Sequence, residues 1–312
     1  MARSKHRGGS GGGDKARPDN RSRSGRQGDR RPENRATGPK LGHSPRPRQE
    51  FHHTERPRPT VPHHGKGGPG RLWLYGRHAV ESALNNPNRQ IRALICTPDS
   101  AETLSGMRRR AGRALPETEI VTKADLEAVL PEGAVHQGLA AQCEPLPERA
   151  LADLLAELDP NAPALLVGLD QVTDPQNVGA VLRSAAAFGA AGLILTERHA
   201  APEGGALARA ASGALDVTPI VRVGNLAKAL DELKEAGFWI FGLAGEGDDR
   251  LDRVDLPDRL VILLGAEGSG LRRLTRERCD RLIRLPTGGP VDQLNVSNAA
   301  AVALYEVARR RT

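Results

Sequence analysis

Residues 164–196 read ALLVGLDQVTDPQNVGAVLRSAAAFGAAGLILT. Two continuous apolar runs, at 165–169 and 193–196, flank a segment over 178–188 whose apolar residues recur with helical spacing. Continuous apolar strands that alternate with helices are typical of a parallel sheet with helices on both faces. This stretch therefore predicts an α/β fold.

The alternation continues through the rest of the chain, so 164–312 is predicted to form one domain. Further strands are expected at 220–223, 239–243, 260–264 and 282–285, and further helices at 203–212, 226–236, 271–278 and from Val296 onward. Ligands of such sheets bind beyond the carboxyl ends of the strands. Three of those ends carry unusual polar loops, which makes them the candidate site.

A smaller α/β domain is predicted for residues 71–147. It opens with an apolar segment over 72–84 that continues as a helix, and it then alternates short strands with helices. The strands are expected at 91–96, 118–122 and 136–143, and the helices at 107–115 and 124–130. Residues 148–163 are interpreted as a linker with one amphipathic helix, which Pro160 and Pro163 close.

Residues 1–70 differ from the rest of the chain in composition. They carry 17 Lys and Arg against 6 Asp and Glu, so their net charge of +11 exceeds the +7 of the whole 312-residue chain. With few large apolar residues, such a segment cannot offset its chain entropy by burial and is expected to be disordered. Its dispersed arginines suit a salt-sensitive electrostatic arm on RNA, and a solvated tail that aids only solubility explains the composition equally well.

Composition also excludes several classes of protein. No apolar run approaches the roughly 20 residues that cross a bilayer, and the N-terminus lacks the apolar core of a signal peptide, so we expect a soluble, cytoplasmic protein. Cys96, Cys143 and Cys279 lie far apart without a C-x-x-C pair, which predicts reduced, mostly buried thiols. A disulfide framework and a metal site are therefore not expected.

The first polar loop follows the strand at 165–169. Asp174 and Pro175 provide a helix-start turn, and Asn177 stands where a helix N-cap is expected. Arg183 falls between the apolar positions of the following helix, near the ligand edge of the sheet. Capping accounts for the asparagine and a surface cation for the arginine, so this loop decides nothing by itself.

The second loop leaves the strand at 260–264 and is rich in glycine. Glu267 is its one acid, among Gly265, Gly268 and Gly270. Glycine lets a backbone approach a ligand and offer it N–H and C=O groups. The loop lacks the Lys-Ser/Thr of a P-loop and the G-x-G-x-x-G dinucleotide spacing, which argues against nucleoside triphosphates and NAD.

The third loop follows the strand at 282–285 and leads through a Gly-Pro turn into the last predicted helix. Asn295 stands at the expected N-cap of that helix, and small residues dominate its apolar face. A face of small residues permits close packing, either within the domain's own core or against another subunit.

Together and in this order, the three loops resemble the motifs of the SpoU/TrmH family of RNA 2′-O-ribose methyltransferases, which belongs to the knotted SPOUT class. The first motif is N-x-G-x-x-x-R, here Asn177, Gly179 and Arg183; the second is G-x-E-G-x-G, here 265–270; the third ends in L-N-V-S, here 294–297. The segments YGRHAVESAL and HQGLAA also resemble the small substrate-binding domain of the family. The resemblance thus covers essentially all of 72–312.

The resemblance implies a deep trefoil knot, a homodimer, and S-adenosylmethionine as the cofactor. Carried over by position, Gly265, Leu285 and Leu294 would contact the cofactor. Glu267 would orient groups of the first or third motif, and Asn295 would position the ribose. With Asn177 and Arg183, these two residues make up the expected catalytic group.

The resemblance leaves the role of Arg183 open between two mechanisms. The family assigns it the removal of the hydroxyl proton, assisted by a substrate phosphate, with Asn177 orienting it. Because a guanidinium is effectively always charged, binding that phosphate and stabilising the developing alkoxide is an equally physical role. Gln293 stands where the family usually has serine, which puts a direct catalytic role of that position in doubt.

The opening segment and the HQG element further resemble the subgroup that methylates a guanosine in the peptidyl-transferase loop of 23S rRNA. Two alternatives remain: the same chemistry on tRNA, and a non-catalytic RNA-binding factor of ribosome assembly. The small domain is expected to select the RNA. Cofactor binding would separate either enzyme from the assembly factor.

Overall fold

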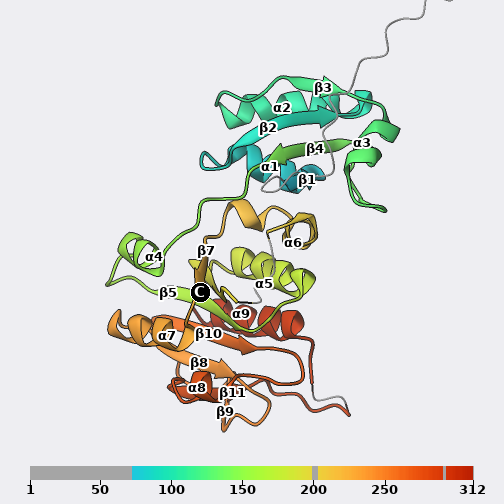
Figure 1. Ribbon diagram of the computed structural model, residues 1–312. Coiled ribbons are helices and arrows are strands. Elements are labelled where there is room, and N and C mark those ends of the chain that lie inside the picture. Colours follow the sequence, from blue (N-terminus) through green and yellow to red (C-terminus); the bar gives the residue numbers. More distant parts are fainter. Residues whose placement is uncertain (1–71, 199–202, 291–292, 312) are drawn as a thin grey trace, which may run out of the picture. The chain divides into compact units, whose positions relative to one another are not determined.

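The computed structural model describes residues 72–198, 203–290 and 293–311 (Figure 1). All of them belong to one structural unit. The predicted disordered tail at 1–70 lies outside these residues. Two sheets organise the described chain, one of four strands and one of seven. Both alternate with helices along the sequence, so the α/β prediction is confirmed.

The four-stranded sheet occupies the N-terminal part of the described chain. Its strand order is β1-β4-β2-β3, in which β4 pairs antiparallel with both neighbours and β2 pairs parallel with β3. Its elements are β1 (Leu72–Tyr75), α1 (Arg77–Asn85), β2 (Ile91–Cys96), the 3-10 helix η1 (Pro98–Ser100), α2 (Ala101–Ala111), β3 (Thr118–Ile120), α3 (Lys123–Val129) and β4 (Leu139–Cys143). The helix α4 (Leu151–Glu157) follows, in the segment predicted as a linker.

Several boundaries in this part differ from the sequence-based prediction: α2 begins at Ala101 rather than at 107, β3 ends at Ile120 rather than at 122, and two further differences have a backbone cause. The helix expected at 107–115 is α2, which ends earlier because Gly112 adopts the left-handed region with φ 62°. The strand expected from 136 begins only at Leu139, because Gln137 and Gly138 both have positive φ and so interrupt extended backbone.

All neighbouring strands of the larger sheet pair in parallel, in the order β7-β6-β5-β10-β8-β11-β9. This confirms the predicted mainly parallel sheet and adds β9, which no sequence pattern indicated. The strands are β5 (Ala164–Asp170), β6 (Gly192–Thr196), β7 (Ile220–Val223), β8 (Trp239–Leu243), β9 (Asp249–Arg250), β10 (Arg259–Gly265) and β11 (Arg281–Arg284). The helical elements are α5 (Pro175–Ala187), α6 (Gly205–Ala211), η2 (Ala214–Asp216), α7 (Leu226–Glu235), α8 (Arg273–Arg276) and α9 (Val296–Arg311).

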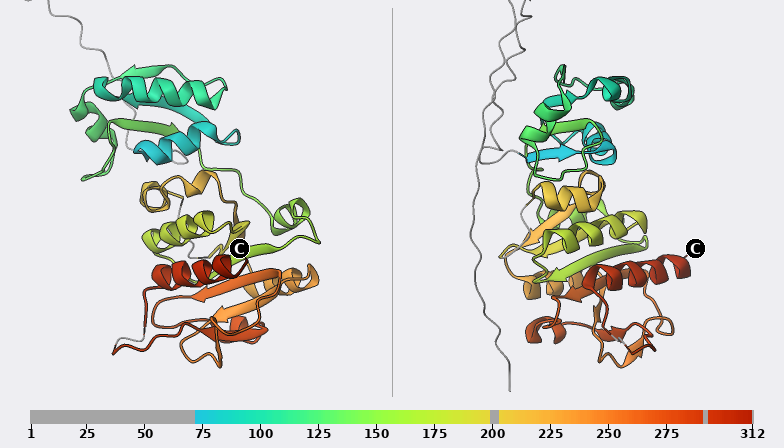
Figure 2. Two further views of the ribbon diagram at one scale, coloured as in Figure 1. Left: turned by 180° about the vertical axis from the view of Figure 1, so that it is seen from behind. Right: turned by 90° about the vertical axis from the view of Figure 1, so that its right-hand side faces the viewer.

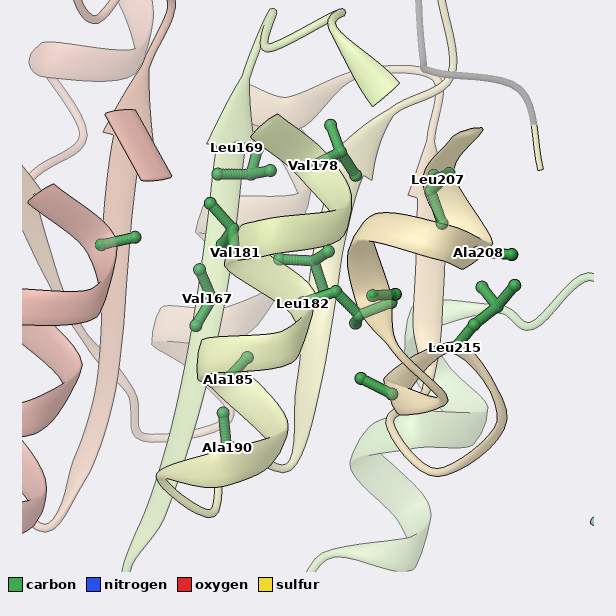
Figure 3. Packing of buried hydrophobic residues seen from close by; sticks show 14 of the residues in the cluster. Val167, Leu169, Val178, Val181, Leu182, Ala185, Ala190, Leu207, Ala208 and Leu215 are labelled. Atoms are coloured by element: carbon green, nitrogen blue, oxygen red, sulfur yellow. The ribbon is translucent and has the colours of Figure 1, made fainter. Parts of the chain in front are cut away.

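Helices cover both faces of this sheet, because alternate residues of each buried strand point to opposite sides. Val167 and Leu169 of β5 belong to a core with α5, α6 and α9, whereas Leu166 belongs to a second core with α4 and α7. Val181 and Leu182 of α5 pack between β5 and α6 (Figure 3). The two views of Figure 2 show α9 beside α5.

The helix ends decide which polar residues are free to act at the site. Asp174, not Asn177, is the N-cap of α5: its Oδ1 accepts from the backbone N–H of Gln176 at 3.1 Å, and Pro175 takes the first helical position. The capping prediction for Asn177 is therefore wrong. Asn295 does cap α9 as predicted, because its Oδ1 accepts from the backbone N–H of Ser297 at 2.9 Å.

The three cysteines are free thiols, with Cys96 and Cys143 buried and Cys279 partly so, which confirms the prediction of mostly buried thiols. Burial raises the pKa of Cys143 to about 12 and that of Cys279 to about 11. Within the described ranges, no helix has the length and apolar character to span a membrane. Over the same ranges, no group of three or more His, Cys, Asp or Glu side chains is placed to hold a metal ion.

Candidate active site

A cavity of about 590 Å³ lies beyond the carboxyl ends of β8 and β10, where ligands of parallel sheets bind. The ends of these strands, the segment after β11 and the start of α9 form its wall. Gly265, Leu285 and Leu294, the residues expected to contact a cofactor, all line it, and so does Gln293. The structure thus brings together residues that lie up to 29 positions apart in the sequence.

The glycine-rich loop forms one side of the cavity. Gly265 ends β10, and a side chain has no room there, because a Cβ would lie 2.1 Å from the carbonyl carbon of Gly270. Ala266 forms an isolated β-bridge with Gly270, whose φ of 64° lies in the left-handed region. The loop therefore closes on itself and presents backbone groups to the cavity.

An ion pair between a buried carboxylate and a half-exposed arginine fixes this loop to the neighbouring strand. The carboxylate of Asp170, fully buried at the end of β5, accepts from the backbone N–H of Arg272 at 3.0 Å and from its Nε at 2.7 Å. Asp170 is also the register partner of Gly265. Both ends of the loop are thus tied to one strand end. Sequence reasoning missed this pair, although a carboxylate that directly follows a buried strand is a usable signal.

Asn177, Glu267 and Asn295, one from each motif, form a hydrogen-bonded group that we call the trio. The Nδ2 of Asn295 donates to the Oδ1 of Asn177 at 3.0 Å and also to the Oε1 of Glu267. The Nδ2 of Asn177 donates to the same Glu267 oxygen at 3.3 Å. Glu267 therefore contacts the first and the third motif at once.

Arg183 is not part of the trio. It lies on α5 six residues beyond Asn177, which corresponds to about 9 Å along the helix axis. Its side chain is exposed and has no hydrogen bond or ion pair with any described residue. An orientation of Arg183 by Asn177 is not seen here, because the amide of Asn177 is bonded to the other two members of the trio.

A second wall of the cavity was not predicted. Residues 243–246, which read LAGE at the end of β8 and just beyond it, line it together with Arg276 and Arg284. Arg276 donates to the carboxylate of Glu246, and this hydrogen bond lowers the pKa of Glu246. A strand that runs into a glycine-containing turn is the same signal that singled out 265–270, so this wall was within reach of the sequence.

The cavity lining fits a ligand that combines apolar rings with charges of both signs. Leu243, Leu264 and Leu285 offer apolar contact, and the glycine loop offers backbone N–H and C=O groups. The lining also contains two acids and two arginines: Glu246, Glu267, Arg276 and Arg284. S-adenosylmethionine has matching features: an adenine ring, a cationic sulfonium and amino group, and a carboxylate.

Two family models match the chain. The model described as SpoU rRNA Methylase family matches residues 164–305, and the one described as RNA 2′-O ribose methyltransferase substrate binding matches residues 73–149. The chain belongs to the SpoU methyltransferase family, whose motifs supply the cavity and the trio. It is 40% identical to the 23S rRNA (guanosine-2′-O-)-methyltransferase RlmB of Vibrio vulnificus, in a match that covers 77% of this chain and 97% of that protein.

Other relatives agree with this assignment. The protein of the same name from Coxiella burnetii is 39% identical over 76% of this chain and 95% of its own length. An uncharacterized tRNA/rRNA methyltransferase of Synechocystis is 38% identical, and the chain spans only 62% of its length. Among solved structures, the SpoU methyltransferase AviRb from Streptomyces viridochromogenes in complex with AdoMet superposes with a TM-score of 0.65 at 27% identity, covering 79% of this chain and 94% of that one.

Proposed function

We propose that this protein transfers the methyl group of S-adenosylmethionine to the ribose 2′-hydroxyl of a guanosine in the peptidyl-transferase loop of 23S rRNA. The observation that carries the proposal is the trio, which joins all three motifs beside a cavity lined by backbone groups. Two relatives that the chain matches over nearly their whole length are named as 23S rRNA guanosine 2′-O-methyltransferases.

Gly265, Leu285 and Leu294 would hold the cofactor in the cavity. Gly265 and its loop would offer it backbone N–H and C=O groups, and the two leucines would offer apolar contact. When bound, S-adenosylmethionine supplies an electrophilic methyl group on its sulfonium. Glu267 lines the same cavity, so the trio lies next to the bound cofactor.

Arg183 supplies the free positive charge that the reaction needs. A ribose hydroxyl is a poor nucleophile until its proton leaves, and negative charge then develops on its oxygen. Because the Arg183 guanidinium stays charged and has no partner in the described part of the chain, it binds a substrate phosphate and stabilises that oxygen. This favours the phosphate-binding role over proton removal by the arginine.

The trio positions the ribose. Asn295 uses both hydrogens of its Nδ2 within the trio and its Oδ1 on Ser297, so it acts on the substrate through its two partners. One N–H of Asn177 and the second carboxylate oxygen of Glu267 have no bond among the described residues. These two groups are the ones that contact the ribose.

Three finer features belong to the same proposal: a trefoil knot, a homodimer and a cytoplasmic location. The insertion of β10 between β5 and β8 supports the knot. The small residues Ala300 and Ala303 are buried in the core of this chain, so the support for a dimer is the exposed Val302 and Tyr305 on α9. A further part of the proposal is that residues 1–70 form an arm that binds RNA. Their net charge of +11 supports a contribution to RNA affinity that weakens as salt rises.

The test is methyl transfer from labelled S-adenosylmethionine to purified, unmodified 23S rRNA and tRNA. We expect label at a ribose 2′-oxygen of 23S rRNA, and Arg183→Ala lowers the rate by about a hundredfold or more. Arg253→Ala is the matched control, since Arg253 is also exposed and its side chain makes no hydrogen bond or ion pair in the described ranges. Transfer to tRNA alone would replace the substrate, and RNA binding without any transfer would favour the assembly factor.

A further inference from the structure

The part of the chain that forms the four-stranded sheet has a second hollow, which has no lining residue in common with the cofactor cavity. It measures about 670 Å³ and lies between η1, α3 and the loop at 131–138 that leads into β4. Ser100, Lys123 and Gln137 line it from three different segments. The proposed transfer reaction uses none of these residues.

The loop beside this hollow is held in a strained conformation. Gln137 has a φ of 51°, a region that residues other than glycine rarely adopt. Gly138 follows with φ 74°, and a Cβ there would lie 2.2 Å from the Oγ of Ser100 and 2.5 Å from the Oγ1 of Thr97. Strain of this kind persists only where the surroundings enforce it, and it is found most often at ligand sites.

Hydrogen bonds from α1, from η1 and from Thr97 just before η1 enforce this conformation. The backbone N–H of Arg77 in α1 donates to the Oε1 of Gln137 at 2.9 Å, and the Oγ of Ser100 in η1 donates to the Gln137 carbonyl at 3.2 Å. The backbone N–H of Thr97 donates to the Gly138 carbonyl at 2.9 Å. Since only its Oε1 is engaged among the described residues, the Gln137 side chain keeps both amide hydrogens for a ligand.

His136 adds a hydrogen-bond donor to the hollow and Glu127 adds an acceptor, and each has bonding capacity left for a ligand. The Nδ1 of the buried His136 accepts from the backbone N–H of Gly138 at 3.0 Å, so the neutral ring carries its proton on Nε2. That Nε2 lies 3.7 Å from the Oε1 of Glu127, and the Nζ of Lys123 lies 3.6 Å from the same oxygen. Both separations are longer than a hydrogen bond.

We infer that this hollow binds an unstacked nucleotide of the RNA substrate, with the base edge on Gln137, Glu127 and His136 and the phosphate near Lys123. The inference rests on the proposed function for its ligand class. Proteins that read RNA sequence bind splayed-out bases and form hydrogen bonds to their edges. An amide, a carboxylate and an imidazole N–H, held by a preorganised loop, match such an edge, and the exposed Val135 offers apolar contact to the ring.

The test measures the affinity of the full-length protein for an unmodified transcript that contains the peptidyl-transferase loop, by fluorescence anisotropy at fixed salt. We expect Val135→Glu and Glu127→Ala each to raise the Kd for this RNA about tenfold and to leave the Kd for S-adenosylmethionine unchanged. Ile120→Glu and Glu132→Ala are the matched controls, because Ile120 is 57% exposed against 67% for Val135, and neither control residue lines the hollow.

An unchanged Kd for the transcript in both hollow variants would overturn the inference. Because the readout is binding, it is independent of methyl transfer. If the wild type binds the transcript without methylating it, the proposed function fails, and weaker binding by the hollow variants still supports the hollow as an RNA site. If the wild type methylates the transcript and the variants bind it equally well, only the inference fails. Absence of binding by the wild type would overturn both.

Discussion

Asn295 performs two tasks with the two ends of one amide. Its oxygen caps α9, and its nitrogen donates to Asn177 and Glu267 within the trio. The cap stabilises a helix, whereas the nitrogen orders the trio, which we propose contacts the ribose. A substitution that keeps the oxygen and removes the nitrogen separates these tasks.

We expect Asn295→Asp to keep the fold and lose the reaction. Aspartate still accepts from the Ser297 N–H, so the free energy of unfolding changes by about 1 kcal/mol or less. Because a second carboxylate cannot donate to Glu267, the trio loses its order, and methyl transfer falls by about a hundredfold or more. Urea unfolding and labelled methyl transfer measure the two effects.

The matched control is Asn298→Asp, an exposed asparagine in the first turn of the same helix. It adds the same charge without touching the trio, and it is expected to retain both stability and activity. Wild-type transfer by Asn295→Asp would show that the trio does not order the substrate.

At the scale of elements, the shape of the glycine loop depends on the absence of a side chain at Gly265. We expect Gly265→Ala to push the loop away from β10, because the added Cβ would lie 2.3 Å from the backbone nitrogen of Leu271. The affinity for S-adenosylmethionine, measured by calorimetry, should fall at least about tenfold, with a loss of about 1–3 kcal/mol in stability. In Gly288→Ala, where the new Cβ meets no atom within 4 Å, the affinity should be unchanged. Equal affinities in the two variants would contradict this account of the loop.

Elements and their contacts differ in how well the sequence predicts them. The strands β5, β8 and β10 lie within one residue of their predicted bounds, because buried parallel strands are continuous apolar runs. The start of α5 was less predictable, since the segment offers several capping residues and Pro175 decides between them. Asn177 and Asn295 were expected in one site only because the three loops, in their order along the chain, resemble the motifs of a known family.

Contacts between distant residues without such a motif stayed hidden. Asp170 and Arg272 lie 102 positions apart, and no local pattern links them. The segment at 243–246 did carry a local signal, the glycine-containing turn after a strand, but its place in the cavity follows from the pairing of β8 with β10. Periodicity reports which face of an element is buried, whereas the pairing of elements is a property of the whole sheet.

At the scale of the whole described chain, Arg89 links the two sheet regions. Its side chain is fully buried; its Nε donates to Asp216 at 2.7 Å, and its Nη1 donates to Glu203 at 2.7 Å and to the Glu144 carbonyl at 2.8 Å. Burial alone would lower the pKa of Arg89, but the two carboxylates more than offset it and raise that pKa. In this link the buried guanidinium and the two carboxylates stabilise each other's charged forms.

We expect Arg89→Met to lower the free energy of unfolding by about 3–5 kcal/mol, because it leaves the buried carboxylate of Asp216 without a counter-charge. Arg92→Met, three positions along the chain, breaks a much more exposed pair with Glu144 and a hydrogen bond to Gln90, and it should cost about 1 kcal/mol or less. Chemical denaturation of both variants compares the two costs. Similar losses in both would show that burial of the Arg89 pair adds nothing.

The separation in sequence between the members of the trio affects the order of events during synthesis and folding of the chain. Asn177 and Asn295 are 118 positions apart, so their contact closes a long loop, and contacts of this kind form late in folding. Cys143, the last residue of the four-stranded sheet, precedes Asn295 by about 150 positions, which a ribosome takes about 8–30 s to translate. A newly made chain therefore completes the sequence of its small sheet well before it can assemble the trio.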